Sequence, residues 1–381
     1  MEQLREAFAP GYSSEVMLRD FFARWFVTDP TAHDLFHIDL SGVREKFGTA
    51  MYWLLSELIA QRTEEPVAFM AQLGRDHRKY GVTDQHHATL ADALLFTLRG
   101  ELADRWDARM EETARHTVDL ICGVMRGSAQ VDAGAEVHEG TVTDNIRVSR
   151  DVSLIRLKLD EPLLYLPGQY VAAQIPQWPR VWRYLSPAIP ANPVGAVEFH
   201  VRSVPGGMVS PVIVHESAPG DRWLLSQPHG GLHIERDGPD VLMVAGSTGL
   251  APMRALLWDM LRFGDDNPRV QLFFGTRWPY ELYDMAELSE IAAANPWLSV
   301  IPVSEYSSNP PWAADYPDIA LPDDQRFTGT LPDVLADYGN WSNWRERQIL
   351  IAGSPAMLSA TMGVLRAAGV DPESISHDPV Y

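Results

Sequence analysis

The sequence predicts a multidomain protein in which an all-α domain, an antiparallel β-barrel and an α/β domain with a parallel sheet follow one another. Three changes along the chain predict this fold class. Apolar residues recur at three- and four-residue spacing up to about residue 126, short alternating segments separated by Pro and Gly follow, and from about residue 240 apolar runs alternate with helical stretches. At 381 residues, with 46% hydrophobic residues and 12 Trp, the chain can fill more than one core.

Composition narrows the classes of partner. A formal net charge of -20 argues against nucleic acid or an anionic membrane surface as the main partner, because both would repel the protein. The single cysteine, Cys122, excludes an intramolecular disulfide and any zinc or iron–sulfur site built on several cysteines. No apolar run approaches the ~20 residues of a spanning helix and the charged start of the chain is unlike a signal peptide, so a cytoplasmic location is expected.

The all-α domain is expected over residues 1–130. Strand-like alternation is absent there, and Pro30 and Gly81 stand where helices tend to end. Five stretches carry the helical periodicity, namely "SEVMLRDFFARWFV", "VREKFGTAMYWLLSELIAQ", "PVAFMAQLGRDHRKY", "QHHATLADALLFTLRGEL" and "RWDARMEETARHTVDLICGVMRG".

The rest of the chain divides into two domains after "GSAQVDAGAE", which is small and polar enough to be a linker. Residues 137–237 contain alternating segments such as "VSLIRLKLD" and "AVEFHVRSV", which predict the antiparallel barrel. Residues 238–381 contain the apolar runs "VLMVAG", "RVQLFFG" and "RQILIAG", which lead towards helical stretches. Strands that alternate with helices predict a parallel sheet covered on both faces.

A glycine-rich turn follows the first apolar run of the last domain. Gly246 to Gly249 ("GSTG") lets the backbone turn tightly before a helix that begins near Pro252. The unpaired N–H groups and the positive dipole end of that helix suit a phosphate group. The turn lacks the GxGxxG spacing, and by itself it is equally compatible with ordinary turn chemistry.

Three motifs of the barrel domain also suit phosphate groups. In "RYLSPA", Arg183 and Ser186 put a fork-shaped cation and a hydroxyl beside an extended strand. "PGQYV" lies close by, and "PGGMVS" supplies two glycines and Ser210 for a second phosphate. Each motif taken singly is also compatible with a plain turn. Only the order of the motifs along the chain favours phosphate binding over a turn.

That order is PGQY, RxxS, GGxxS, a G-[ST]-x-G-x-[AP]P turn, "GTR…ELY" and a last strand ending in "GSP". It resembles the ferredoxin-reductase-like family of FAD-dependent, nicotinamide-oxidising reductases over residues 137–381. The resemblance implies FAD and NAD(P)H as cofactors. It implies FAD contacts for Tyr170, Arg183, Tyr184, Ser186, Gly206, Gly207 and Ser210. It implies nicotinamide nucleotide contacts for Gly246, Thr248, Gly249 and Pro252, and places Arg277 and Tyr283 near the ribose or adenine end.

Two positions depart from that family, and the chain end matches it. Leu185 stands where the family has the aromatic ring of R-x-[YF]-[ST], which leaves open whether Tyr184 next door substitutes for it. Ala352 stands where a cysteine often lies close to the nicotinamide. Tyr381 matches family members whose last residue is an aromatic ring stacked on the flavin, and a functionless terminus is the alternative.

"FFARWFVTDPTAHDLF", followed about 40 residues later by a helix with "DHRKYGV", resembles the globin domain of flavohaemoglobins, in their divergent actinobacterial-type branch. The resemblance implies haem b, with His77 as the proximal iron ligand and Phe36 as the ring packed on the haem. A lone helical histidine is otherwise more often structural or solvated, and the pairing with a reductase favours the ligand. His86 and His87 are expected to cap the next helix or to lie at the surface.

The globin-like part also departs from its family. Phe22 stands at the position of a ligand-stabilising Tyr, and His87 at that of a Tyr behind the proximal histidine. The last helix offers no evident Glu to pair with that position, and neither Asp76 nor Asp84 can be placed against His77. These departures weaken the stabilisation of bound oxygen and the support for O–O activation.

The two resemblances together imply a flavohaemoprotein oxidoreductase that passes electrons from NAD(P)H through FAD to haem, and that in this family acts as a nitric oxide dioxygenase, converting NO and O2 to nitrate. O2 and NO, or another small diatomic molecule, are the expected ligands, and Phe22, Phe36 and Tyr381 the residues expected beside the reacting groups. Two other functions stay open: an FAD-dependent reductase with another acceptor or an organic donor, and a haem-based or haemless sensor that gates a reductase. NADH against NADPH and the oligomeric state also stay open.

Overall fold

The structure is a computed structural model, and it describes residues 1–36, 40–131, 134–264, 266–314, 326–339 and 344–378. The chain divides into two compact units. The helical unit contains residues 1–137 together with 179–181, and the two-sheet unit contains residues 138–178 and 182–381.

The helical unit is all-α, as the periodicity predicts. Its α-helices are α1 (Glu2–Ala7), α2 (Tyr12–Thr28), α3 (Ser41–Ile59), α4 (Glu64–His77), α5 (Asp84–Leu102) and α6 (Ala108–Val131). Short 3-10 helices join them, namely η1 (Pro30–Leu35), η2 (Arg78–Tyr80) and η3 (Ala103–Arg105). Because α6 continues to Val131, the first residues of the predicted linker are helical.

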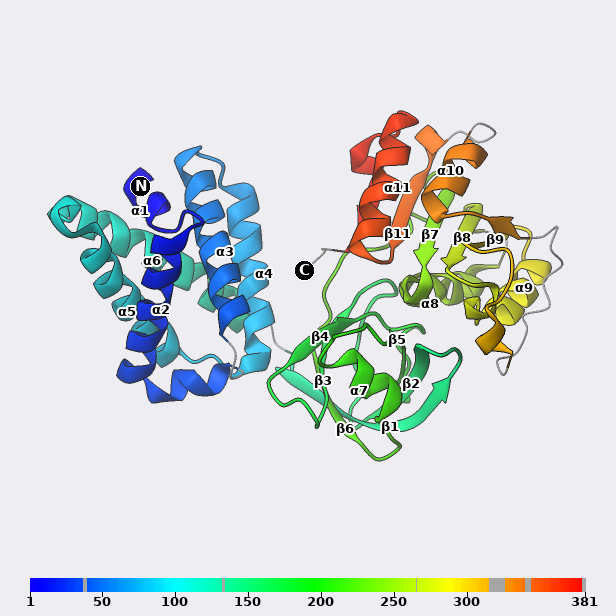
Figure 1. The fold of residues 1–381 in the computed structure, drawn as a ribbon, viewed down its shortest axis with the longest axis horizontal. Helices are drawn as coiled ribbons and strands as arrows, with labels where there is room; N and C mark the ends of the chain where they lie inside the picture. The colour runs from blue at the N-terminus through cyan, green and yellow to red at the C-terminus, as the bar shows by residue number, and fades with distance from the viewer. Residues whose placement is uncertain (37–39, 132–133, 265, 315–325, 340–343, 379–381) are drawn as a thin grey trace. The chain divides into compact units, whose positions relative to one another are not determined.

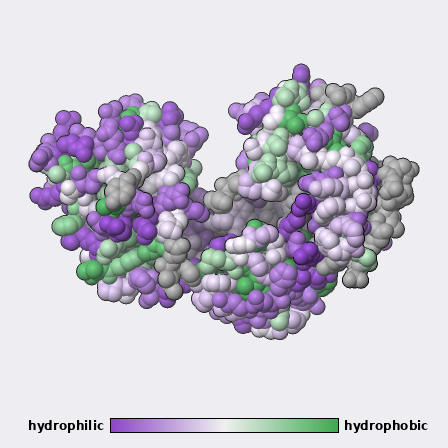
Figure 2. Space-filling view, viewed as in Figure 1, coloured by the Kyte–Doolittle hydropathy of each residue, from purple (hydrophilic) through white to green (hydrophobic). Residues whose placement is uncertain are grey.

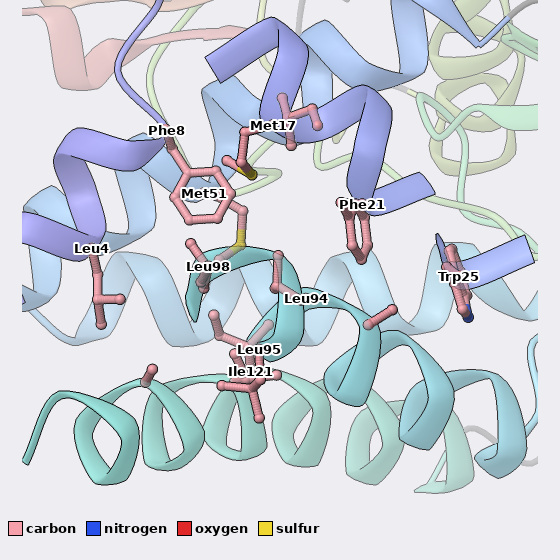
Figure 3. Close-up of a cluster of buried hydrophobic side chains, with 14 of the residues drawn as sticks. Leu4, Phe8, Met17, Phe21, Trp25, Met51, Leu94, Leu95, Leu98 and Ile121 are labelled. Atoms are coloured by element: carbon pink, nitrogen blue, oxygen red, sulfur yellow. The ribbon is translucent and has the colours of Figure 1, made fainter. Parts of the chain in front are cut away.

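The core of the helical unit is formed by apolar side chains that point towards one another from several helices (Figure 3). The labelled members are Leu4, Phe8, Met17, Phe21, Trp25, Met51, Leu94, Leu95, Leu98 and Ile121. Phe21 is fully buried and stacks on Phe47 with ring centroids 5.3 Å apart. Full burial of such a side chain contributes about 1.5–3 kcal/mol, so this cluster dominates the packing of the helices.

Local sequence sets the end of α4. Gly81 adopts φ 71°, a left-handed conformation that glycine reaches without strain, and it ends η2 directly after α4. Thr83 then starts α5, because its Oγ1 accepts a hydrogen bond from the backbone N–H of His86 (3.3 Å) while its own N–H donates to His86 Nδ1 (3.1 Å). The predicted helix end at Gly81 and the predicted capping role of His86 are confirmed, although the His86 side chain is buried.

Hydrophilic side chains cover most of the visible face of the helical unit, among scattered hydrophobic ones (Figure 2). Phe96 is an exposed aromatic residue of α5, and the guanidinium of Arg24 lies 3.4 Å from its ring centroid.

In the part of the chain that the structure describes, no helix is both long and apolar enough to cross a membrane.

The first sheet of the two-sheet unit is the antiparallel half-barrel that the alternating segments predict. Within the described residues its strand order is β4-β3-β6-β1-β2-β5. The elements are β1 (Val137–Arg147), β2 (Val152–Leu159), β3 (Val171–Gln174), β4 (Trp182–Leu185), β5 (Ala196–Arg202), α7 (Ser210–His215) and β6 (Arg222–Ser226). An isolated antiparallel bridge between Pro187 and Phe199 joins the segment after β4 to β5.

The second sheet is parallel, as predicted, with the strand order β10-β9-β8-β7-β11-β12. Its strands are β7 (Val241–Gly246), β8 (Val270–Thr276), β9 (Leu298–Ser304), β10 (Phe327–Thr328), β11 (Gln348–Ala352) and β12 (Ile375–His377). Its helices are α8 (Leu250–Met260), α9 (Met285–Ala294), α10 (Leu331–Gly339) and α11 (Pro355–Ala367). The direction of chain travel across the sheet reverses between β7 and β11, and such switch points are where sheets of this class bind ligands.

Helices cover both faces of this parallel sheet (Figure 1). Met243 and Ala245 of β7 pack in one core with Leu257 of α8. Leu242 and Val244 of the same strand pack in the second core, with residues of α10 and α11. Alternate strand residues therefore face opposite helical layers, which explains the continuous apolar run "VLMVAG".

Candidate functional site

His77 is the last residue of α4, and its ring is half-buried. Its Nδ1–H donates a hydrogen bond to the carbonyl oxygen of Leu73, one turn earlier (2.7 Å). That hydrogen bond selects the tautomer in which Nε2 carries the free lone pair. Burial lowers the pKa of His77 and so favours the neutral, metal-ligating form, although the nearby charge of Asp76 acts in the opposite direction.

Phe22 and Phe36 lie together in an aromatic cluster of the helical unit. The Phe22 side chain, on α2, is buried and meets the edge of Phe36 with ring centroids 5.7 Å apart. It also meets Phe47 of α3 at 5.9 Å. The structure thus brings these two sequence-predicted residues into contact, and the phenyl rings of Phe22, Phe36 and Phe47 offer no hydrogen-bond donor.

His87 of α5 lies close both to His77 and to Arg126 of α6. Burial, then the positive charge of Arg126 and the proximity of His77, lower the pKa of His87 to about 4. His87 is thus half-buried and neutral at pH 7, where the sequence predicts a capping or surface residue. Arg126 was not predicted from the sequence, because it lies 39 positions from His87 and only the packing of α6 brings its charge close.

The surroundings of His77 fit a haem. The ring of Tyr80 meets that of His77 with centroids 5.6 Å apart, packs against the core of the helical unit and remains half-exposed, which leaves apolar surface for a large planar ring to cover. Haem iron needs one histidine from the protein besides its four ring nitrogens. Accordingly, the described residues contain no group of three or more His, Cys, Asp or Glu side chains arranged to hold a metal ion.

Two tyrosines predicted to contact FAD meet on the half-barrel. The rings of Tyr170 and Tyr184 have centroids 5.0 Å apart in an edge-to-face arrangement. Tyr184 lies on β4 between Arg183 and Leu185, and successive strand residues point to opposite faces. Tyr184 therefore points to the face opposite to that of Leu185, towards Tyr170.

The other predicted FAD residues lie at two turns. Arg183 is exposed and Ser186 half-buried at the end of β4. The Oγ of Ser210, at the start of α7, accepts a hydrogen bond from the N–H of Val204 (3.1 Å) and so closes the turn that contains the predicted glycines. These glycines are exposed, and one of them adopts a left-handed φ of 76°; they are Gly206 and Gly207.

The glycine-rich turn lies at the switch point between β7 and β11. A Cβ atom built on Gly249 lies 2.1 Å from the carbonyl oxygen of Ala352, so this close approach of two backbones requires glycine. The same added Cβ atom on Gly249 lies 2.8 Å from the backbone nitrogen of Gly353, so the two turns meet at these glycines. The order of motifs includes "GSP", but this contact of Gly353 was not predicted from the sequence.

The remaining residues predicted for this turn lie beside it. Thr248 is half-buried in the short 3-10 helix η4 (Ser247–Gly249), and Pro252 is buried in the first turn of α8. Ser247 has a left-handed φ of 51°, and its Oγ accepts a hydrogen bond from Arg202 Nη1 (3.0 Å). Such strain in a non-glycine residue concentrates at ligand sites.

Arg277 and Tyr283, predicted to lie near one end of the nucleotide, differ in their surroundings. Arg277 is exposed after β8, with its guanidinium carbon 5.8 Å from the ring centroids of Trp278 and Tyr306. The rings of Trp278 and Tyr306 stack with their centroids 3.9 Å apart. Neither residue was predicted from the sequence to lie at the site. Tyr283 instead hydrogen-bonds to His200 Nδ1 of the half-barrel (3.0 Å), so the two predicted residues are not brought together. Tyr381 lies outside the described residues.

Glu198 of β5 is a buried carboxylate at the junction of the two sheets. It accepts hydrogen bonds from Arg156 Nε (2.7 Å) and Arg254 Nη1 (3.2 Å), and His200 Nε2 lies 3.3 Å away. Burial alone would raise its pKa. The hydrogen bonds from His200 and Arg156 and the charge of Arg254 overcome that effect and lower the pKa of Glu198 to about 2.

This depressed pKa predicts a pH-dependent contribution to stability. The ionised Glu198 contributes about 3 kcal/mol to the free energy of unfolding above pH 4.5, and this contribution is lost as the pH falls from about 4.5 to about 2. Glu198→Gln is therefore expected to unfold at lower urea concentration than the wild type at pH 7, with a difference that shrinks towards pH 3. The exposed Glu216→Gln is the control. An equal difference at both pH values would contradict the prediction.

Three family models match successive parts of the chain. A globin model matches residues 19–125, an oxidoreductase FAD-binding domain model matches residues 139–234, and an oxidoreductase NAD-binding domain model matches residues 243–362. The half-barrel and the parallel sheet described above thus coincide with the second and third models.

Curated relatives and solved structures agree with these models. The chain is 32% identical over 252 residues to the ferredoxin–NAD(P)(+) reductase component of naphthalene 1,2-dioxygenase/salicylate 5-hydroxylase systems from Ralstonia sp, covering 65% of this chain and 70% of the relative. A flavohemoglobin from Malassezia yamatoensis, solved with bound FAD and heme, matches 98% of this chain and 95% of its own, with a TM-score of 0.76 and 13% identity. The flavohem-like FAD/NAD-binding domain of a nitric oxide dioxygenase from Vibrio cholerae matches 64% of this chain and 98% of its own, with a TM-score of 0.51 and 18% identity. The last two likenesses are likenesses of fold.

Proposed function

Because this chain belongs to the ferredoxin–NAD(P)(+) reductase family and carries a globin domain ahead of the reductase, in the architecture of a flavohaemoglobin, we propose that it passes electrons from NAD(P)H through FAD to haem held by His77. The protein is an NAD(P)H-dependent oxidoreductase. The observation that supports the haem part is the hydrogen bond from His77 Nδ1 to Leu73, which leaves Nε2 as the ligand atom.

His77 holds the haem, and the rest of the helical unit sets what reaches it. Haem held by His77 would supply one-electron chemistry and the binding of a small diatomic molecule such as O2. The Leu73 carbonyl keeps the imidazole in one tautomer and one orientation. The phenyl rings of Phe22, Phe36 and Phe47 exclude water from their part of the core and offer no hydrogen bond to a ligand.

The finer activity that we propose is the oxidation of NO by O2 to nitrate. A flavohemoglobin and a domain of a nitric oxide dioxygenase are among the solved structures whose fold this chain shares, which supports it. The test is a visible spectrum before and after anaerobic addition of NADH or NADPH, followed by nitrate measurement when O2 and NO are supplied. We expect bleaching of the flavin bands, a shift of the Soret band and catalytic nitrate formation. Flavin bands without a Soret band in protein expressed with added haem would overturn the haem assignment.

A second candidate function is reduction of another electron acceptor. Phe22 favours it, because its side chain offers no hydrogen-bond donor to bound oxygen. His87 favours it, because a histidine near His77 that itself lies near the positive charge of Arg126 supplies no negative charge to strengthen electron donation to iron. Two of the curated relatives that match are reductase components of dioxygenase systems. Flavin and haem reduction without nitrate formation would support this second function.

Phe22→Tyr is expected to slow O2 dissociation from the reduced protein by about tenfold to hundredfold, because a new phenol donor adds about 1–3 kcal/mol of ligand stabilisation. Flash photolysis or stopped-flow mixing measures the rate. Phe96→Tyr adds the same hydroxyl at an exposed position of α5 and is expected to leave the rate unchanged. An unchanged rate in Phe22→Tyr would show that Phe22 does not face the bound ligand.

A further inference from the structure

A cluster of polar side chains crosses the junction between the half-barrel and the parallel-sheet part of the two-sheet unit. We call it the Arg254 cluster. Its members are Glu198 and His200 of β5, Arg254 of α8, and Tyr283, Asp284 and Glu287 in or before α9.

Arg254 makes most of the contacts in this cluster. Its Nη1 donates to the backbone oxygen of Ala188 (3.0 Å) and to Glu198 Oε1 (3.2 Å), both on the half-barrel side. Its Nε lies 2.9 Å from Asp284 Oδ2, and its Nη2 lies 2.7 Å from Glu287 Oε2, both on the parallel-sheet side. The side chain is only 8% exposed. A buried guanidinium is costly unless it is paired. The paired guanidinium of Arg254 therefore holds the half-barrel and the parallel-sheet part in one relative geometry.

Arg254 and its partner Ala188 each lie close in sequence to one of the two cofactor motifs. Arg254 follows Pro252 by two residues, on the helix that begins at the glycine-rich turn Gly246–Gly249. Ala188 follows Ser186 by two residues, in the segment that continues from the predicted flavin motif. One side chain therefore connects the motif expected to hold the nicotinamide nucleotide with the motif expected to hold FAD.

A second contact runs parallel to the first. The Tyr283 hydroxyl lies 3.0 Å from His200 Nδ1, and their rings meet edge to face at 5.3 Å. Phe274 of β8 also meets the Tyr283 ring edge to face, with centroids 5.8 Å apart. Tyr283 therefore connects His200 of β5 to the parallel sheet, where Phe274 of β8 packs against its ring.

We propose that Arg254 and Tyr283 are positioning residues that hold the two cofactor-binding parts in the geometry for hydride transfer. The inference rests on the proposed function, in which the dihydronicotinamide is oxidised by giving a hydride, with both electrons, to FAD, which is reduced. Neither residue touches the reacting atoms. They act through the backbone after Ser186 and through α8, and so set how closely the two rings meet.

Anaerobic stopped-flow reduction of the bound FAD by NADH and NADPH tests the proposal in Arg254→Lys, which keeps the positive charge and loses the planar fork. We expect the limiting rate of flavin reduction to fall by about tenfold to hundredfold, because small misplacements cost that much. The FAD content, the Kd for the nucleotide and the reoxidation of reduced enzyme by ferricyanide are expected to stay at wild-type values. Amide hydrogen exchange, measured without turnover, is expected to speed up in β5 and α8.

Matched variants separate positioning from general destabilisation. Arg222→Lys makes the same change in an arginine that pairs with Glu139 (2.6 Å) and Asp160 (2.5 Å) within the half-barrel, and it is expected to leave flavin reduction unchanged. Tyr283→Phe removes only the hydroxyl that meets His200 and is expected to lower the same limiting rate. If Arg254→Lys fails to fold or to retain FAD, Tyr283→Phe decides the question.

The outcomes separate this inference from the function on which it rests. A wild-type flavin that neither NADH nor NADPH reduces would overturn the proposed function and the inference with it. Wild-type reduction together with unchanged limiting rates in Arg254→Lys and Tyr283→Phe would overturn the inference alone. A lower limiting rate with unchanged nucleotide Kd in either variant, and an unaffected Arg222→Lys, would support it.

Discussion

His77→Ala is expected to lose its Soret band and its bound iron while retaining FAD that NAD(P)H still reduces. The ring of His77 supplies the only free imidazole nitrogen that we assign to iron, and the hydrogen bond to Leu73 has no substitute once the ring is gone. Because changes around a ligand already cost 10- to 100-fold in metal affinity, removal of the ligand itself is expected to cost more than about 100-fold. Absorption spectra and metal analysis of the purified protein measure both losses.

His116→Ala is the matched control, because His116 is an exposed histidine of α6 in the same helical unit. It is expected to keep the wild-type spectrum. A normal Soret band in His77→Ala would assign the iron to another residue, and loss of FAD reduction in the same variant would show that the two units depend on each other for folding.

Gly249→Ala is expected to abolish reduction of the flavin by NAD(P)H and to destabilise the two-sheet unit by about 1–3 kcal/mol, the usual cost of overpacking. The added Cβ would lie 2.1 Å from the Ala352 carbonyl oxygen and 2.8 Å from the Gly353 nitrogen. Both are backbone atoms, so the turn after β7 and the turn after β11 must separate at the predicted nucleotide site. Urea unfolding and anaerobic flavin reduction measure the two effects.

Gly363→Ala provides the control for this change. Gly363 lies within α11 of the same sheet domain, and a Cβ atom there meets nothing within 4 Å. The substitution is expected to stabilise the protein by about 0.5–1 kcal/mol, because alanine loses less conformational freedom in a helix. Gly249→Ala with wild-type flavin reduction would mean that the nucleotide does not bind at this turn.

The domain architecture was predictable from sequence because its signals are local. Helical periodicity and strand alternation depend on neighbours within a few residues, and the structure confirms the all-α, antiparallel and parallel parts that they predict. The helix end at Gly81 was predictable for the same reason, since the left-handed conformation there favours glycine. The turn at Gly246–Gly249 was located by its composition, although its contact with the strand end at Ala352 was not.

Contacts between distant residues were not predictable in this way. The hydroxyl of Tyr283 meets His200, 83 positions earlier, and no signal in the sequence predicted this contact. Arg254 and Ala188 are 66 positions apart. No periodic pattern links such pairs, because each partner satisfies its own local pattern and only the packing of one sheet against the other brings them together.

By itself, the sequence determined the order of the three domains, the positions of the glycine-rich turns and the histidine at the end of α4, because each depends on residue type and short-range spacing. Only the tertiary structure decided which groups share a site: Arg126 with His87 near His77, and Arg254 between the two cofactor motifs. The physical reason is that burial and charge pairing are properties of the packed chain. A side chain's pKa and partners depend on elements that the sequence brings close only after folding.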